Sequence, residues 1–329
     1  MKKNKYLHRR RPMASRFHGI RRRTKHIARN VLVIVGNGFD LHHGIPSSYW
    51  NFRDYIVEHD NDLLDTMEEH FASDSLWSDF EGTLAYLDTD MIADNASDYL
   101  VSYGAEDWSD AYHHDYQRAI DEVLNGITDK MPKLFTEWVL QLPVTNDVVA
   151  RKLNLIRKAK FLTFNYTPTL EIVYQIPADR ICYLHHKAVN INSNLIVGHG
   201  IPPTPKAPPT EFQLAEMESA DPRVLHGERS LAGYLAETYK PTDKILRDNK
   251  VFFESLRGVD EIHVLGHSLS DVDWPYFRRV VAATRRNFPL WKFSFHDPSK
   301  VAVYRQALED MGIPPDNIRF ARMASIYNP

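Results

Sequence analysis

The sequence predicts an α/β protein in which a doubly wound, mostly parallel sheet carries helices on both faces. The first reason is the continuous apolar run Val31–Val35, which suits a strand buried on both sides better than one with a solvent face. The second is the turn Gly36–Gly38 directly after it, where the chain can bend tightly and start a helix. The third is the later alternation of short apolar strands with helical segments, which is typical of right-handed crossovers. Together these features predict a Rossmann-like sheet.

The other strands are recognised as short runs of apolar and β-branched residues between turn-forming residues. Beyond Val31–Val35, strands are expected at 160–164, 180–184, 195–198, 261–265 and 291–295. Helices are expected between them at 167–175, 242–257, 272–288 and 298–312. The proline-rich stretch 201–210 fits neither element, so we expect a surface loop there, either a lid or a plain connector.

The stretch from 47 to about 155 has helical patterning and no strand pattern. Ser47 or Ser48 suits the N-cap of its first helix, at 49–57. Further helices are expected at 60–72, 77–88 and 108–141. We therefore expect one domain, 30–329, with a large helical insertion at about 47–155 that covers the site.

Residues 1–29 form a basic arm ahead of this domain. The arm holds 12 Lys or Arg residues and no Asp or Glu, so the rest of the chain is acidic overall. Such a segment is expected to be solvated and flexible. Three roles stay open: binding of RNA or DNA by residues 2–29, a tether onto the acidic body, or an extended start upstream of Met13.

Cysteine content and hydropathy indicate the compartment. Cys182 is the single cysteine, which rules out a disulfide within the chain and favours a reducing compartment. No apolar run is long enough for a bilayer, and the first residues lack the apolar middle of a secretory signal. We therefore expect a cytoplasmic protein without a membrane partner. No metal is expected, because adjacent histidine pairs point apart on a helix and no H-E-x-x-H pattern occurs.

The turn Gly36–Gly38 lies at the carboxyl end of the first strand, where open α/β sheets bind ligands. Its backbone N–H groups and the following helix start suit a phosphate. Leu41 stands where the full dinucleotide fingerprint has its third glycine, so an ordinary dehydrogenase is not expected. Asn37 and Asp40 add polar groups at this edge. The sequence thus predicts a nucleotide-type site, with a plain turn and helix cap as the alternative.

Several motifs carry a resemblance to a known family, namely Gly36–Leu41, Pro46–Tyr49 with Phe52, Trp77–Glu81, Phe164–Thr167 and Gly266–Asp271. In combination, from residue 31 to about 298, they resemble the AbiH family of bacterial abortive-infection proteins. That family is more distantly similar to sirtuin-like domains, which consume NAD. The resemblance implies a sirtuin-like form of the predicted fold and a role in defence against bacteriophages.

The sirtuin-like pattern also implies which residues form the site. Four positions depart from it. Thr167 replaces a common aspartate, and His186 replaces the usual glycine. In the glycine loop, Asn37 replaces a common alanine and Asp40 a common serine. With one cysteine there is no zinc module, so protein deacetylation of the usual kind is not expected. The positions implied are a nucleotide loop at Gly36–Gly38 with Asp40, a ribose-orienting asparagine at Asn165, a histidine base at His185, and an adenosine-ribose loop at Gly266 and Ser268.

Hydrolysis of NAD would need few groups. The ribose gains oxocarbenium character as neutral nicotinamide leaves, as a sugar does in glycoside hydrolysis. The amide of Asn165 can donate and accept at once, which suits a ribose hydroxyl or a water. His185, with an ordinary pKa near ~6.5, suits a general base at neutral pH. The phosphates are expected on the amides of Gly36–Gly38.

Five further side chains are candidates without an assigned role: Glu81, His186, His199, His267 and Asp271. Glu81 is either a carboxylate aimed at the glycine loop or part of a solvated helix face. The histidines lie at strand ends and loops, where function concentrates, yet each also suits a structural hydrogen bond. Asp271, like Ser268, also suits a helix cap.

The expected function is that of an abortive-infection effector resembling an NAD glycohydrolase, with NAD or a related nucleotide as substrate or ligand rather than as a permanently bound cofactor. Two alternatives stay open: a nucleotide-sensing module without turnover, favoured by Thr167 and His186, and a nucleic-acid-directed effector. Beyond the nucleotide and a nucleic acid bound by residues 2–29, the sequence leaves open two partners, a trigger protein from phage or host and a second copy of the chain.

Overall fold

The computed structural model describes residues 30–327 apart from 107, 146–151 and 204–219. The basic arm 1–29 and most of the proline-rich stretch 201–210 lie outside the described residues, and so do the expectations attached to them. No helix among the described residues combines the length and the apolar character needed to cross a bilayer.

A six-stranded parallel sheet forms the centre of the fold, in the order β3-β2-β1-β4-β5-β6. Its strands are β1 Val31–Val35, β2 Lys160–Thr163, β3 Ile181–Tyr183, β4 Glu261–Leu265, β5 Leu290–Ser294 and β6 Ile318–Ala321. The predicted α/β class and parallel sheet are confirmed. Strand order reverses between β1 and β4, and ligands of open α/β sheets bind at such a reversal.

The central strand is β1, because all five of its residues are apolar and buried. Four of the expected later strands are confirmed, as β2, β3, β4 and β5. The strand expected at 195–198 is wrong: these residues form no ladder, and Leu195 and Val197 pack against helices instead. Strand β6 is not among the expected strands, because only Ile318 of its four residues is buried and its apolar pattern is weak.

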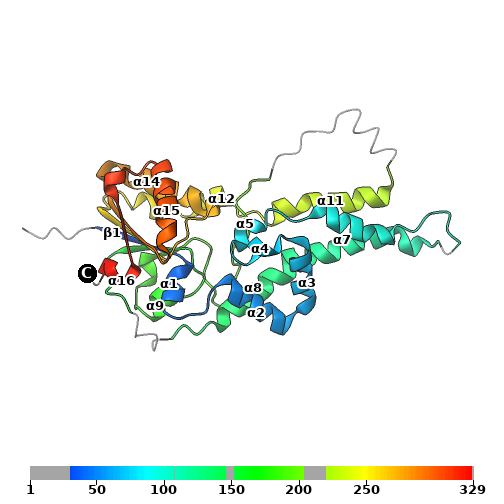
Figure 1. Ribbon diagram of the computed structural model, residues 1–329, viewed down its shortest axis with the longest axis horizontal. Helices are drawn as coiled ribbons and strands as arrows, with labels where there is room; N and C mark the ends of the chain where they lie inside the picture. The colour runs from blue at the N-terminus through cyan, green and yellow to red at the C-terminus, as the bar shows by residue number, and fades with distance from the viewer. Residues whose placement is uncertain (1–29, 107, 146–151, 204–219, 328–329) are drawn as a thin grey trace, which may run out of the picture.

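Helices cover both faces of the sheet, and alternate residues of β1 face the two layers (Figure 1). Ile34 shares a core with helices α12 to α15, and Val33 shares the opposite core with α1, α9 and α16. Their bounds are α1 Asn37–His42, α9 Thr169–Ile172, α12 Thr242–Asp248, α13 Lys250–Glu254, α14 Trp274–Thr284, α15 Val301–Asp310 and α16 Met323–Tyr327.

The remaining helices form a second body beside the sheet, here called the helical lobe (Figure 1). Its helices are α2 Tyr49–His59, α3 Asn61–His70, α4 Ser73–Leu76, α5 Phe80–Thr83, α6 Thr89–Ala96, α7 Asp115–Asn125, α8 Met131–Gln141 and α11 Pro222–Glu237. Its core is aromatic, with the rings of Phe52 and Phe135 5.1 Å apart. The expected helix at 77–88 is largely wrong, since only α5 is helical within it. The chain returns to this lobe after β3, where α11 packs along α7.

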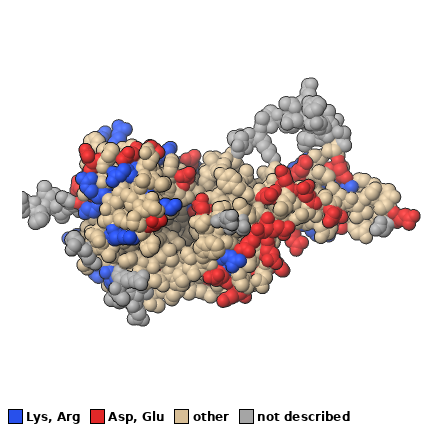
Figure 2. All heavy atoms as spheres, in the orientation of Figure 1, with Lys and Arg blue, Asp and Glu red and all other residues tan. Residues whose placement is uncertain are grey.

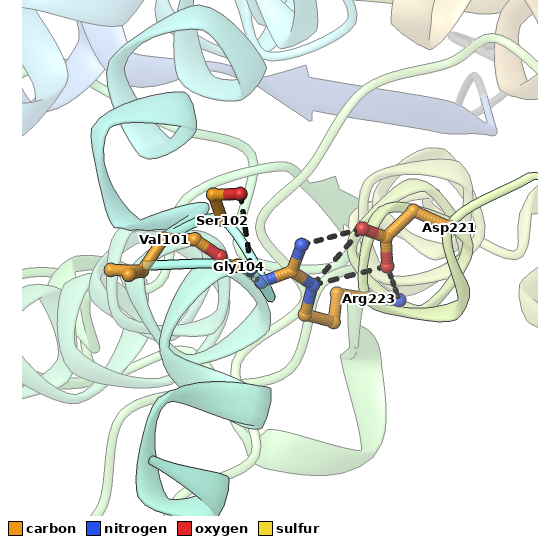
Figure 3. Close-up of polar contacts among 5 residues, drawn as sticks. All are labelled: Val101, Ser102, Gly104, Asp221 and Arg223. Carbon is orange, nitrogen blue, oxygen red and sulfur yellow. Dashed lines mark hydrogen bonds and ion pairs between the residues drawn. The ribbon is translucent and has the colours of Figure 1, made fainter. Parts of the chain in front are cut away.

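Arg223, near the start of α11, holds the turn around Val101 at the end of the helical lobe far from the sheet (Figure 1 and Figure 3). Its guanidinium bonds both carboxylate oxygens of Asp221 and donates to the Val101 carbonyl at 2.7 Å. It also lies 4.2 Å from the centroid of the Tyr103 ring. Arg223 is only 4% exposed, so a planar cation that donates from all three of its nitrogens holds this turn onto α11.

We expect Arg223→Lys to lower the free energy of unfolding by about 1–3 kcal/mol, because an ammonium group cannot reproduce the bidentate contact or the ring stacking. Chemical denaturation of the variant and the wild type measures the change. Arg118→Lys is the matched control, since the Arg118 side chain is 70% exposed in its pair with Asp115. That control should change stability by less than about 0.5 kcal/mol. Equally small changes in both variants would show that Arg223 does not hold the turn.

Candidate functional site

A cavity of about 730 Å³ lies at the carboxyl ends of the strands, where the strand order reverses between β1 and β4. One side of its wall consists of the residues that follow β1, β2, β3 and β4. The helical lobe closes the other side with Tyr49, Phe80, Phe135 and Trp138. A largely apolar wall facing a few polar groups is typical of a site for a small organic ligand.

Most of the sequence-predicted residues line this one cavity. They are Gly36, Asn37, Gly38, Asp40, Glu81, Asn165, His185, Gly266, His267 and Ser268. Their convergence follows from the sheet, because the carboxyl ends of parallel strands meet at one edge. The structure does not place three candidates on the cavity, namely His186, His199 and Asp271.

Each of these three residues has a structural explanation. His186 has a backbone φ of 67°, in the left-handed region that favours glycine, and its Nδ1 lies 2.6 Å from the Asn194 carbonyl. His199 is fully buried, and its Nδ1 accepts from the Ile201 N–H at 3.1 Å. Asp271 is exposed and begins the 3-10 turn ahead of α14.

The glycine loop is part of an interlocked backbone contact. The Gly36 N–H donates to the Leu265 carbonyl at 3.0 Å, and the Gly38 N–H donates to the Gly266 carbonyl at 2.8 Å. A Cβ on Gly38 would lie 2.8 Å from the Gly266 Cα, so only glycine lets the two loops approach this closely. The N–H groups of Gly36 and Gly38 are therefore already bonded, and these two glycines shape the cavity. Phosphate binding at the amides of Gly36–Gly38 stays a prediction.

Asp40 brings a buried carboxylate to the cavity from α1, with 1% of the residue exposed. Its Oδ2 accepts from the Thr167 hydroxyl at 2.5 Å, and that hydroxyl lies 3.0 Å from the Thr169 hydroxyl. Its Oδ1 has no partner among the residues that the structure describes. Burial raises the pKa of Asp40 to about 6, and the bonds from Thr167, Thr169 and Asn165 oppose the rise.

Asn165 follows β2 and His185 follows β3, on neighbouring strands. The Asn165 N–H donates to Thr163 Oγ1 at 3.0 Å, while its side-chain Oδ1 has no partner in the described part of the chain. His185 hydrogen-bonds the Phe164 backbone, and its Nε2 likewise has no described partner. Burial, with a contribution from Lys240, lowers the pKa of His185 to about 3. The expectation of an ordinary histidine pKa is therefore wrong, and the ring is neutral at pH 7.

Asp273 is a cavity residue that the sequence analysis did not single out. His267 Nδ1 accepts from the Leu269 N–H at 2.9 Å, which places the ring proton on Nε2, 3.3 Å from Asp273 Oδ2. Burial alone would raise the pKa of Asp273, but the His267 hydrogen bond and the charge of Lys240 outweigh burial and lower it. Asp273 is therefore an anion, and its position as the second aspartate of Asp271–Asp273 was the only sequence signal.

Glu81 connects the cavity to a buried ion pair. Its Oε2 lies 2.6 Å from Lys240 Nζ, and the Lys240 side chain is 0% exposed. Its Oε1 accepts from the Tyr166 hydroxyl at 3.1 Å. Burial raises the pKa of Glu81, and the charge of Lys240 opposes the rise. Glu81 thus lines the cavity as anticipated, but it pairs with Lys240 rather than pointing at the glycine loop. Lys240 was missed because nothing in its local sequence indicates a partner 159 positions away.

Four buried acceptor atoms of cavity residues have no hydrogen-bond partner among the described residues: Asp40 Oδ1, Asn165 Oδ1, His185 Nε2 and Asp273 Oδ1. Buried polar groups are normally bonded, and a carboxylate oxygen or a neutral imidazole nitrogen can only accept. This wall therefore suits a ligand with several hydroxyl donors. Two of the four atoms belong to carboxyl groups, so it also suits positive charge.

The surface charge differs between the two bodies of the molecule. In the view of Figure 2, Asp and Glu gather over the helical lobe, whereas Lys and Arg gather mainly over the sheet and its helices. Arg322, after β6, is the one Lys or Arg among the described residues that lines the cavity, and its guanidinium lies 5.0 Å from the Phe295 ring centroid. The cavity could therefore bind an anionic group of a ligand at Arg322 and a cationic group at Asp40 and Asp273.

Comparison with known proteins adds one finding. A family model described as bacteriophage abortive infection AbiH matches residues 32–295, and the chain belongs to this family. No curated protein matches the chain, and no solved structure matches it. The predicted AbiH resemblance is confirmed, and the more distant sirtuin-like similarity stays a prediction.

Proposed function

We propose that this member of the AbiH family is an abortive-infection effector that binds NAD or a related nucleotide in the cavity and hydrolyses the bond between nicotinamide and ribose. The observation that carries the proposal is the set of four unpartnered acceptor atoms around one cavity. Ribose hydroxyls are donors that match such acceptors. The strand order supports the same ligand class, because doubly wound sheets with this order bind dinucleotides at the reversal.

The charge distribution favours one orientation of the nucleotide. The phosphates lie toward Arg322, since the Gly36 and Gly38 amides are already bonded. The nicotinamide end, which carries positive charge in NAD, lies toward Asp40 and Asp273. A volume of about 730 Å³ falls within the range of roughly 300–1,000 Å³ usual for ligand pockets.

The chemistry that this wall supports is departure of a neutral group from a sugar. Positive charge develops on the ribose as the C–N bond breaks, and fixed carboxylates in a buried site stabilise such charge. Asn165 lies beside Asp40, whose pKa it lowers, and its unpartnered Oδ1 is left for a ribose hydroxyl, so it orients the sugar against the carboxylate. The aromatic wall of the helical lobe keeps bulk water from the bond that breaks.

The test is release of nicotinamide from NAD by the purified protein, followed by chromatography. We expect Asn165→Ala to reduce the rate at least about 100-fold, because the ribose loses its orienting amide. His186→Gly is the matched control: it changes a residue outside the cavity and keeps a backbone conformation that glycine adopts freely, so the rate should stay near wild type. Full activity in Asn165→Ala, or no nicotinamide from the wild type, would contradict the proposal.

The lowered pKa of His185 favours a second candidate, a nucleotide sensor without turnover. A histidine with a pKa of about 3 is a weak base at neutral pH. Calorimetry with NAD separates the two functions, because a sensor would bind the nucleotide and return it intact. Binding without nicotinamide release, in the presence of phage components as well as in their absence, would replace hydrolysis by sensing.

A further inference from the structure

We propose that Asp40, rather than His185, takes the proton of the attacking water and faces the charged ribose in this site. Asp40 has this catalytic role only if the NAD hydrolysis proposed above takes place. The sequence pattern implies that Asp40 binds the nucleotide and that His185 is the general base. We assign the general base to Asp40 instead.

The two carboxylate oxygens of Asp40 are bonded unequally. Oδ2 is fixed by the Thr167 hydroxyl, and that hydroxyl is in turn 3.0 Å from the Thr169 hydroxyl. Oδ1 is buried and unpartnered in the described part of the chain, although the residue lines the cavity. A carboxylate with a purely structural role is expected to have both oxygens bonded. The geometry is instead that of a carboxylate oriented by one oxygen and left reactive at the other.

The charges around Asp40 also favour this role. No described Lys or Arg forms an ion pair with it, in contrast to Glu81, which Lys240 neutralises. The Tyr183 hydroxyl, on β3, interacts electrostatically with Asp40 but donates its hydrogen bond to Glu171. The Glu171 carboxylate is in turn 2.8 Å from Lys187 Nζ. The charge of Asp40 is therefore not compensated locally, so it is available to a cationic ribose.

The two candidate bases also differ in pKa. The Asp40 carboxyl has a pKa of about 6 and the His185 ring a pKa of about 3. A general base is most effective when its pKa lies near the working pH, which favours the carboxylate. His185 stays neutral, and its Nε2 lone pair accepts from a ribose hydroxyl or from the water.

The step balances without any other reactant. The water oxygen forms a bond to C1′ of the ribose as the bond from C1′ to the nicotinamide nitrogen breaks, and its electron pair leaves with nicotinamide, which becomes neutral. One proton of the water passes to Asp40 Oδ1 and later to solvent. The products are nicotinamide and ADP-ribose.

The test uses the full chain and the pH dependence of kcat/KM for nicotinamide release. Asp40→Asn keeps the size of the side chain but removes the base, so we expect kcat to fall roughly 10²–10⁴-fold with little change in KM. The wild-type rate should fall below a pH of about 6, and this acidic limb should be absent in Asp40→Asn. In His185→Gln the fall in rate below a pH of about 6 should remain, however slow the variant is. Loss of the limb in His185→Gln with its retention in Asp40→Asn would overturn the assignment.

Two further measurements keep the assignment open to refutation if Asp40→Asn does not fold. Thr167→Val removes a bond that lowers the pKa of Asp40, so the acidic limb should move to higher pH. Azide needs no base, so it should restore nicotinamide release to Asp40→Ala and yield ADP-ribosyl azide. The role of Asp40 would be refuted if the wild type hydrolyses NAD but the acidic limb does not move in Thr167→Val and Asp40→Ala gives no ADP-ribosyl azide. A wild type that releases no nicotinamide would remove both proposals.

Discussion

Replacing Gly266 by alanine is expected to cost about 3–5 kcal/mol of the free energy of unfolding and to abolish ligand binding. Gly266 has a φ of +65°, and an added Cβ would lie 2.2 Å from the Phe39 nitrogen and 2.3 Å from the Gly38 carbonyl carbon. Both atoms are backbone, so neither can move aside as a side chain would. The loop after β4 would have to separate from the loop after β1, and this separation would open the cavity.

Gly44→Ala is the matched control for backbone strain. Gly44 has a φ of +81° with nothing within 4 Å of an added Cβ, so this variant has the strain without the collision. We expect it to cost only about 1–2 kcal/mol. Urea denaturation of both variants, with ADP-ribose calorimetry on each, measures the difference. Equal losses in the two variants would mean that contact between the loops does not hold the cavity together.

The interlocked glycines explain why one part of the site could be predicted and another could not. Val31–Val35 and the glycines after it indicate a buried strand and a tight turn, and parallel strands place their ends together. That reasoning was enough to bring Asn165 and His185 to the same cavity as the glycine loop. It did not show that the Gly36 and Gly38 amides bond the β4 loop, because strand neighbours are set by pairing across the whole chain.

Charge and protonation were the least predictable features. The histidine at 185 was assigned an ordinary pKa because a sequence does not show burial, and burial is the largest cause of its lowered value. Asp273 and Lys240 bear no motif, and each acquires its role from partners that folding brings close. The segment 195–198 has the apolar alternation of a strand because Leu195 and Val197 pack against the helical lobe. Its local sequence does not show that these side chains contact helices rather than a sheet.

Lys240 carries the other large expected effect, because it is the buried partner of the cavity residue Glu81. We expect Lys240→Met to lower the free energy of unfolding by about 3–5 kcal/mol at pH 7, since Glu81 would stay buried without its partner. Lys133→Met is the matched control: Lys133 pairs with Asp129 while 66% exposed, and its loss should cost less than about 1 kcal/mol.

The sign of the pH dependence distinguishes an orphaned charge from lost packing. In Lys240→Met, the pKa of Glu81 rises further above its unfolded value, so the folded state binds a proton that the unfolded state releases. The deficit should therefore shrink as pH falls from 7 toward about 5, where the carboxyl becomes neutral. Adding Glu81→Gln to Lys240→Met should recover most of the loss at pH 7, because no buried charge then remains. The loss of unfolding free energy could instead be constant with pH and unchanged in the double variant. That result would attribute the loss to packing of the Lys240 side chain, and Lys240 would have no part in setting the charge of the cavity.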